Sequence, residues 1–518
     1  MPVRGRVFCL VFLNIFCHNI KFCGIMITWQ LSLVNLQELI RNMKEPERLV
    51  GFINYDDNEI AFEFDSDDFS LYLYPKKELW KKYAHPSYIL GKHSMDLKNH
   101  EWIPENRLSG ITSDGEKIIF SVQGEPGSYH GFLSFRVIWY FCCYDEMETN
   151  RISGFSITGD AIDAFYSPRV ALEQKQEHDE NFVITKTVVS STKKPTAGGG
   201  TYTLADGVTA TIEIDAYSAV SWGDYRHPIY AISKFITEFS EPVTLDTTIK
   251  VLGYTLEFFI YVTYRANVGL RKIDLFVNDN GKHDYLGILV FPKVEEEKNV
   301  EARNHLIVYG DLKEKTSMIF DAIINEKISI QHICSDYNAI HSYPISRVIM
   351  ILAAFERIYG NIYGKDTERS EEYLEIKGKV VEYIEQLWNE TTGKRKKAAK
   401  ALKDYVFNRD SSFTSNTAYA LKDCAEIMEP FIKRRYNGDF ESVVEGISER
   451  IGYVRNGVAH CRLDFELEAI HLSDIMIMEE LLYAMQLKHI GLTTHECHEA
   501  IGRLFRERIH FKDDGNVD

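Results

Sequence analysis

The residue types best suited to chemistry lie together at positions 455–460, which read Arg-Asn-Gly-Val-Ala-His. An arginine stays charged at neutral pH and can hold phosphate oxygens in a bidentate manner. A histidine titrates near neutral pH, so it can take or give a proton during a reaction. Arg455 and His460 could therefore support cleavage of RNA without a metal, in which the ribose 2′-hydroxyl attacks the adjacent phosphate. One copy supplies one histidine, whereas two copies would supply both a base and an acid.

A helical pattern over residues 439–459 positions this motif. Its apolar residues recur at steps of three and four and predict one buried stripe: Phe440, Val443, Val444, Ile447, Ile451, Val454 and Val458. Arg455 borders the stripe. Asn456 and His460 are four residues apart and share a face, so the Asn456 amide can orient the imidazole. In a chain with 17 histidines the Arg–His spacing alone is expected by chance, so the helical context carries the prediction.

The first half of the chain is rich in aromatic and β-branched runs separated by Gly, Asp and Asn clusters, a pattern typical of β-sandwiches and barrels. One helix is expected within this region, at residues 227–240, from apolar residues at helical spacing. The expected strands cover residues 48–64, 69–75, 117–122, 132–141, 209–220, 248–264, 272–277 and 285–291.

From about residue 313 the pattern changes to helix. An amphipathic helix is expected at 315–328, and a strongly apolar helix begins at Pro344, a residue favoured at the start of helices. Further helices are expected over residues 371–390, 394–408, 416–436, 439–459, 465–489 and 494–508.

Composition limits the class of protein. A chain of 518 residues with 45% hydrophobic residues can bury a large core and favours more than one domain. The nine cysteines include no CxxC pair, which favours reduced thiols in a cytoplasmic protein over a disulfide framework or a zinc cluster. No later segment is apolar enough for a transmembrane helix, so we expect no stable membrane association.

Because the net charge is −17, any contact with RNA needs a local basic patch. Lys396, Lys400 and Lys403 share one face of the helix expected at 394–408 and are the candidate. A solvated helix face with no role in binding is the alternative.

The N-terminal residues form a basic and then apolar leader that is similar to the start of a signal peptide, but no small-x-small cleavage site follows. The alternative, which we favour, is that translation begins at Met26 or Met43 and that the leader is not native.

The Arg-Asn-x-x-x-His motif at 455–460 resembles that of HEPN ribonuclease domains. The apolar helix over 348–364, with Glu356 at an acidic position, is similar to the first helix of the ApeA-like HEPN group, although Phe355 stands where that group has a leucine-like residue. The β-rich first half and the connector at 315–328 also resemble ApeA, so the resemblance covers roughly residues 45–510.

The resemblance implies an anti-phage defence protein of the abortive-infection type. It implies a metal-independent endoribonuclease that works as a homodimer, with the two motifs meeting across a cleft. Carried over, Arg455 would bind the scissile phosphate, His460 would transfer the proton, and Asn456 would orient His460.

We therefore expect an α+β protein with a leader over 1–44, a β-rich sandwich-like or barrel-like domain over 45–310, a helical connector over 311–340, a helical HEPN domain over 341–510, and a tail over 511–518. RNA is the expected substrate, a phage-derived trigger is expected to act on the β-rich domain, and no metal or cofactor is required. The alternatives are a non-catalytic HEPN scaffold or a ligand-binding regulatory protein that dimerises through its helical domain.

Overall fold

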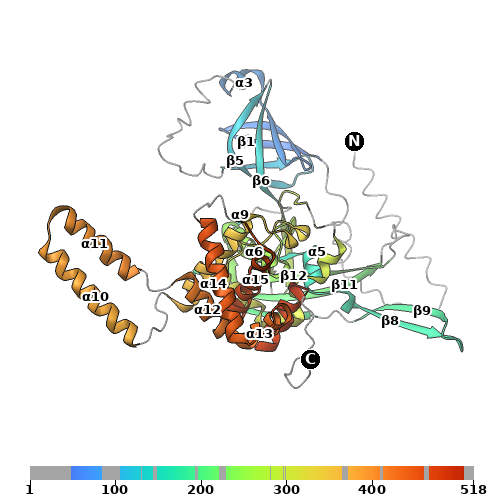
Figure 1. Cartoon of the computed structure of the whole chain (residues 1–518). Helices are drawn as coiled ribbons and strands as arrows, with labels where there is room; N and C mark the ends of the chain where they lie inside the picture. Colours follow the sequence, from blue (N-terminus) through green and yellow to red (C-terminus); the bar gives the residue numbers. More distant parts are fainter. Residues whose placement is uncertain are drawn as a thin grey trace, which may run out of the picture.

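The computed structural model describes residues 48–83, 106–129, 131–143, 149–192, 196–220, 229–279, 282–295, 297, 299–364, 371–408, 412–459 and 466–506. The expected leader (1–44) and tail (511–518) lie outside these described residues. A β-rich N-terminal region precedes a helical C-terminal region, as expected for an α+β protein (Figure 1). Among the described residues, no helix is long and apolar enough to cross a membrane.

The first part of the chain forms a closed six-stranded antiparallel barrel, at the top of Figure 1. The strand order is β6-β3-β2-β1-β4-β5, and β5 pairs again with β6 to close it. Its interior is packed with aromatic rings, among which Phe64, Phe120 and Tyr140 contact one another. The strands are β1 (Arg48–Tyr55), β2 (Asn58–Asp65), β3 (Ser70–Tyr74), β4 (Asn106–Thr112), β5 (Lys117–Tyr129) and β6 (Phe132–Cys143).

The long strand β6 belongs both to the barrel and to a second sheet. One of its edges pairs with β5, whereas the other pairs first with β3, through residues 133–136, and then with β14, through residues 140–143. The second sheet continues from β14 in the order β14-β13-β7-β12-β11-β10. Its strands are β7 (Ile152–Ile157), β10 (Thr196–Thr203), β11 (Thr209–Val220), β12 (Ile229–Val243), β13 (Lys272–Asp279) and β14 (Lys282–Val290).

A β-bulge in β6 fixes which side chains enter which core. Val137 and Trp139 pair with consecutive residues of β5, which leaves Ile138 as an extra residue. Because side chains alternate along a strand, the extra residue reverses the alternation. Val137 and Tyr140 therefore face the barrel interior, whereas Trp139 and Phe141 join the second core.

The second core lies between the sheet and the helices. The helix α6 (Leu245–Thr263) forms its middle layer. On one side, Phe259 of α6 packs edge-on against Phe235 of β12, with ring centroids 5.4 Å apart. On the other side, Tyr261 of α6 stacks on Tyr483 of the helical region at 4.7 Å. The β-sheet and the helical region thus share one continuous core, and no boundary between cores lies at residue 310.

Strands β4, β7 and β10 were not predicted from the sequence, and two predicted elements have the wrong type. The helix expected at 227–240 is wrong, because residues Ile229–Val243 form strand β12. That strand is paired on both edges and covered in part on both faces, so its apolar residues do not alternate simply. The strand expected at 248–264 is also wrong, because these residues lie in α6. Thr244 caps α6 by accepting a hydrogen bond from the backbone N–H of Thr247, and the buried residues follow helical spacing.

The helical region follows the predicted ranges closely. The expected helix at 416–436 is two helices that meet at Cys424. The helix α15 lies at the centre of the region and is buried on all sides through most of its length. The helices are α8 (Thr316–Ile324), α9 (Ile345–Tyr363), α10 (Glu371–Glu390), α11 (Gly393–Asn408), α12 (Phe413–Asp423), α13 (Ala425–Arg435), α14 (Phe440–Ala459), α15 (Ala469–Ile490) and α16 (Thr494–Leu504).

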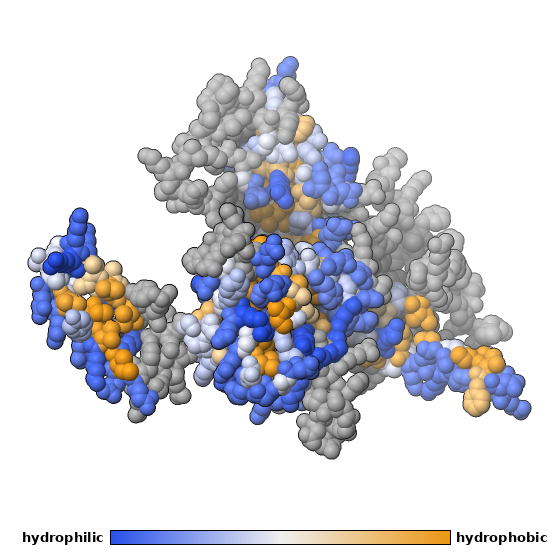
Figure 2. Space-filling model, viewed as in Figure 1, coloured by the Kyte–Doolittle hydropathy of each residue, from blue (hydrophilic) through white to orange (hydrophobic). Residues whose placement is uncertain are grey.

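Two hairpins project from this body in Figure 1. One is the helical pair α10–α11, and the other is the two-stranded sheet β8–β9 (Leu172–His178 and Ile184–Ser191). Figure 2 shows apolar surface on the helical pair and near the end of the strand pair. The exposed apolar residues include Ile376, Val380 and Tyr383 on α10 and Phe182 at the turn between β8 and β9.

Candidate functional site

Arg455 of the motif contacts Glu356, 99 residues earlier in the chain. Its Nε and Nη2 donate hydrogen bonds to the same oxygen, Glu356 Oε1, at 3.3 and 3.0 Å. The side chains are 37% and 48% exposed, so the pair lies at the surface and solvent reaches both partners. The two positions singled out in the sequence therefore form one surface feature.

Two amphipathic helices bring this pair together. Helix α9 begins after Pro344, which fills the N-cap position, and buries Val348, Ile351 and Phe355. Helix α14 buries five of the seven residues of the stripe predicted from its sequence, including Ile451 and Val454, and Phe440 and Val443 are partly buried. Both buried faces belong to the same core, so the residues at their borders meet at the surface.

Of the other two motif residues, Asn456 and His460, only Asn456 lies among the described residues. Asn456 is exposed on α14, next to Arg455. Helix α14 ends at Ala459, and His460 lies outside the described residues. Its proximity to Arg455, and the proposed bond from Asn456, stay predictions. Gly457 and Val458 are buried, so the glycine faces the helical core.

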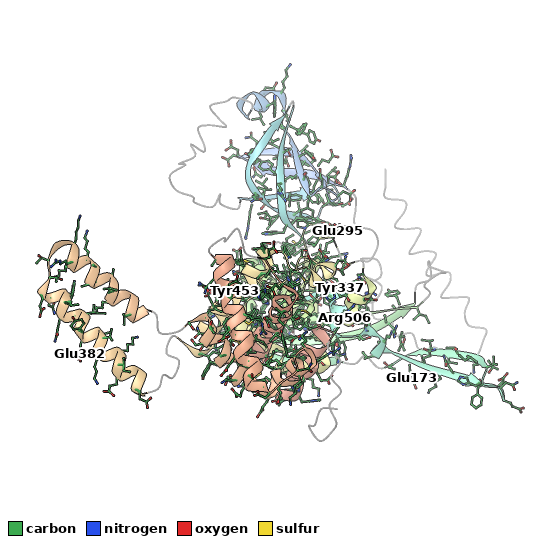
Figure 3. The ribbon with its side chains drawn as sticks, viewed as in Figure 1. Glu173, Glu295, Tyr337, Glu382, Tyr453 and Arg506 are labelled. Carbon is green, nitrogen blue, oxygen red and sulfur yellow. The ribbon has the colours of Figure 1, made fainter. Side chains whose placement is uncertain are left out.

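Exposed apolar side chains lie on the same two helices as the pair. Ile345, Ile349 and Met350 of α9 are exposed, and helical spacing places Ile345 and Ile349 on the face that carries Glu356. Tyr453 of α14 is also exposed, two residues before Arg455, and Figure 3 shows it on the helical body. The charged pair thus lies within a mixed surface with an apolar component.

The basic face of α11 packs partly against its neighbour. The ammonium groups of Lys396 and Lys403 lie over the ring of Trp388 on α10, at 5.1 and 5.9 Å from its centroid. Lys403 also forms an ion pair with Glu385. These contacts favour a structural role for two of the three lysines, and Lys400 is exposed.

A buried polar cluster behind α9 was not found from the sequence. Arg347 of α9 donates from Nη2 to Glu479 of α15 at 2.7 Å, and both side chains are almost fully buried. Its Nη1 donates to three backbone carbonyls of residues 339–342. The hydroxyls of Tyr264 and Tyr343 also donate to Glu479. The sequence does contain a signal for this cluster, because Arg347 and Glu479 are charged residues within strongly apolar helices.

The two partners of the ion pair respond differently to their surroundings: burial raises the pKa of the Glu479 carboxyl, and its contacts with Arg347, Tyr264 and Tyr343 lower that pKa only in part. Burial by itself would lower the pKa of Arg347, but the Glu479 carboxylate and the Tyr264 hydroxyl raise it above its ordinary value. His332 lies beside Arg347 and is fully buried, and burial together with the arginine charge lowers its pKa to about 3. Neither His332 ring nitrogen has a hydrogen-bond partner among the described residues. His332 is therefore neutral at physiological pH.

Across the part of the chain that the structure describes, no three His, Cys, Asp or Glu residues gather as metal ligands would. Comparison with protein-family models, with curated proteins and with solved structures finds no match to this chain.

Proposed function

We propose that this chain is an anti-phage HEPN ribonuclease that cuts RNA without a metal and acts as a cytoplasmic homodimer. In this proposal Arg455 binds the scissile phosphate and stabilises its developing negative charge. His460 transfers a proton to or from the reacting oxygens, and Asn456 holds the imidazole in one orientation.

The contact between Arg455 and Glu356 supports the proposal most directly. The resemblance singled out both positions, and both side chains are accessible at one surface. Since a chance Arg–His spacing has no reason to lie beside the acidic position of another motif helix, the contact favours a functional pair.

Glu356 would act as a stand-in for RNA. A phosphate oxygen requires the same Nε–H and Nη2–H donors that the carboxylate accepts from Arg455. RNA would therefore displace Glu356, and the carboxylate would keep the arginine in place and reduce unproductive anion binding until then.

The surrounding surface supports a dimer. One motif supplies one histidine, and acid–base cleavage needs both a proton acceptor and a proton donor. Exposed Ile345 and Ile349 lie on the face of α9 that carries Glu356, so an interface formed through them would bring two motifs together. A phage-derived trigger that acts on the β-rich region would release this activity.

The test is RNA cleavage in the presence of EDTA. We would compare the wild-type protein with Arg455→Ala, His460→Ala and Asn456→Ala, with trigger supplied by infected-cell extract. Arg357→Ala is the matched control, because Arg357 follows Glu356 on α9 and forms an exposed ion pair with Glu326. We expect the Arg455 and His460 variants to lose cleavage and the Arg357 variant to keep it. Cleavage that survives both substitutions, or that requires a divalent metal, would overturn the mechanism.

A second candidate is a non-catalytic regulatory protein that dimerises through its helices. The observation in its favour is that the Arg455 charge is already paired within the chain. A dimer that binds RNA with equal affinity in the wild type and in Arg455→Ala, and that cleaves none, would support this candidate.

A further inference from the structure

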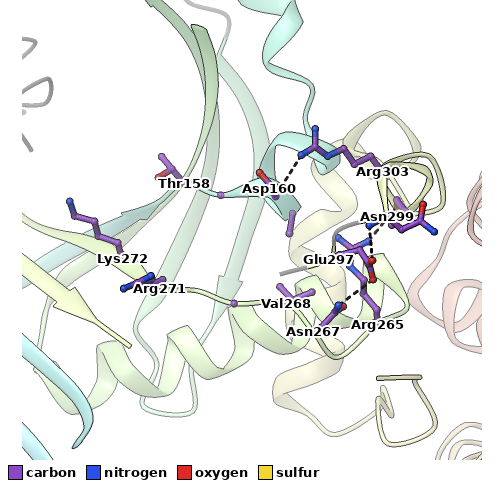
Figure 4. A pocket seen from close by; sticks show the side chains of 14 residues that line it. Thr158, Asp160, Arg265, Asn267, Val268, Arg271, Lys272, Glu297, Asn299 and Arg303 are labelled. Atoms are coloured by element: carbon purple, nitrogen blue, oxygen red, sulfur yellow. Dashed lines mark hydrogen bonds and ion pairs between the residues drawn. The ribbon is translucent and has the colours of Figure 1, made fainter. Parts of the chain in front are cut away.

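A cavity of about 100 Å³ lies between the second sheet and the loops that lead to the helical region. Its walls come from four separate segments, as Figure 4 shows. Residues 158–161 follow β7, Arg265 and residues 267–269 follow α6, and Arg271 and Lys272 lead into β13. The wall is completed by Glu297, Asn299, Ala302 and Arg303. The cavity is distinct from the surface that carries Arg455.

The lining is more basic than the protein as a whole. The described residues that line it include four cations, Arg265, Arg271, Lys272 and Arg303, and two carboxylates, Asp160 and Glu297. Cations thus outnumber carboxylates among these residues, whereas the whole chain has a net charge of −17. A concave basic site of this kind attracts anions.

The carboxylates are engaged in holding the walls. Asp160 accepts a hydrogen bond from Arg303 at 2.9 Å. Glu297 accepts from the side chain of Asn267 at 3.2 Å and from the backbone N–H groups of Asn299 and Tyr337, each at 2.9 Å. Neither carboxylate makes a hydrogen bond to Arg265 among the described contacts.

Arg265 is the central feature of the cavity. Its side chain is only 5% exposed, and Nη1 donates a single long hydrogen bond, at 3.4 Å, to the carbonyl of Ala302. Its buried Nε has no hydrogen-bond partner among the described residues. Burial lowers the pKa of Arg265, so the site disfavours the charge that the side chain carries. A buried guanidinium with an unmet donor costs free energy unless a ligand supplies the acceptor.

We propose that this cavity binds the phosphate group of a small molecule. A phosphate monoester carries nearly two negative charges at neutral pH, which suits a lining in which the described cations outnumber the carboxylates. Its terminal oxygens are strong acceptors and can supply the hydrogen-bond partner that the buried Nε–H of Arg265 lacks. The volume suits one phosphate group, with the rest of the ligand directed toward solvent.

The position of the cavity gives such a ligand access to the helical region. Arg265 directly follows Tyr264, whose hydroxyl donates to Glu479 in the buried cluster with Arg347. Residues 265–267 also pair with residues 334–335, ten residues before the start of α9. Ligand binding would therefore stabilise the segment that leads to α9.

Isothermal titration calorimetry with three probes at constant ionic strength would test the proposal. The probes are inorganic phosphate, glucose 6-phosphate and acetate, and the variants are Arg265→Gln and Lys272→Gln. Lys186→Gln is the charge-matched control, since Lys186 lies on β9 and pairs with Glu177 there. Circular dichroism would establish that each variant is folded, and Lys272→Gln serves alone if Arg265→Gln does not fold.

We expect both phosphate probes to bind with one site per chain. We expect Arg265→Gln and Lys272→Gln to raise Kd by about tenfold or more and Lys186→Gln to leave it unchanged. Tighter binding of glucose 6-phosphate would identify a phosphate ester as the ligand, and equal binding would identify the free anion. If neither phosphate probe binds, if acetate binds as tightly, or if the folded pocket variants bind like the wild type, the proposal is overturned.

Discussion

Arg455 donates two hydrogen bonds to one carboxylate oxygen of Glu356, across the contact between α14 and α9. The pair has good geometry but is open to solvent on both sides. Exposed ion pairs contribute about 0–1 kcal/mol to stability, so this contact has little value as a structural support. Arg455 can therefore leave Glu356 and bind another anion at a small cost in free energy.

Replacing Glu356 should change RNA binding while leaving the stability of the fold nearly unchanged. We expect Glu356→Gln to lower the free energy of unfolding by less than about 1 kcal/mol. RNA binding should become tighter, because the Arg455 donors no longer face a competing charge. Fluorescence anisotropy with labelled RNA, in a His460→Ala background, measures this. Glu326→Gln is the control, since it frees the adjacent Arg357 instead. Weaker RNA binding by Glu356→Gln would contradict the stand-in role.

The buried ion pair between Arg347 and Glu479 should contribute much more to stability than the exposed pair. We expect Arg347→Met to lower the free energy of unfolding by about 3–5 kcal/mol, because it leaves Glu479 buried without its charge partner. Arg357→Met, on the same helix but in an exposed pair, should cost less than about 1 kcal/mol. Urea unfolding of both variants measures the difference, and similar losses would show that burial of the Glu479 charge is not the cause.

Stability should depend on pH through His332. Its pKa is about 3 in the folded protein and 6.5 in the unfolded chain. Between these values only the unfolded chain binds the proton, so stability falls as pH decreases from 6.5, by up to about 1.4 kcal/mol per pH unit. Asp163 has the opposite effect, because burial raises its pKa to about 6.

Comparison with His332→Phe isolates the contribution of the histidine. As pH falls from about 6 to about 5, the wild type should lose about 1.4 kcal/mol of unfolding free energy relative to the variant. The variant is therefore favoured at low pH. A constant difference across that range would show that His332 is not neutral in the folded protein.

The barrel should tolerate no side chain at Gly51. A Cβ at this position would lie 2.1 Å from the carbonyl oxygen of Ile111 on the neighbouring strand β4. We expect Gly51→Ala to lower stability by about 1–3 kcal/mol, as other overpacked substitutions do. Gly198→Ala in β10 is the control, because a Cβ there meets nothing within 4 Å. Thermal unfolding followed by circular dichroism compares the two, and equal stability of both variants would exclude a close approach at Gly51.

The sequence predicted the helical region well, for identifiable reasons. Its helices are long, carry apolar stripes at steps of three and four, and include the start at Pro344. The break at Cys424 was missed, because the apolar pattern continues across it. The resemblance marked Glu356 and Arg455 as positions of interest, but their contact depends on how two distant helices pack.

The two misassigned elements of the β-rich region share one cause. A strand covered on both faces and a buried helix both place apolar residues at short, irregular intervals, so periodicity alone could not separate β12 from α6. The bulge at Ile138 depends on the exact register of β6 against β5, and the unmet donor of Arg265 depends on how distant segments enclose it. Local sequence carries no signal for either.

The sharing of β6 between two sheets limits how this protein can be divided. The barrel strands end at Cys143, which would make that residue a natural place to cut the chain into modules. The remaining part would then lose the strand that pairs with residues 287–290 of β14. An open strand edge of this kind recruits other chains and promotes aggregation. The barrel strand β6 therefore protects the edge of the second sheet, and a separate second sheet would require a replacement strand beside β14.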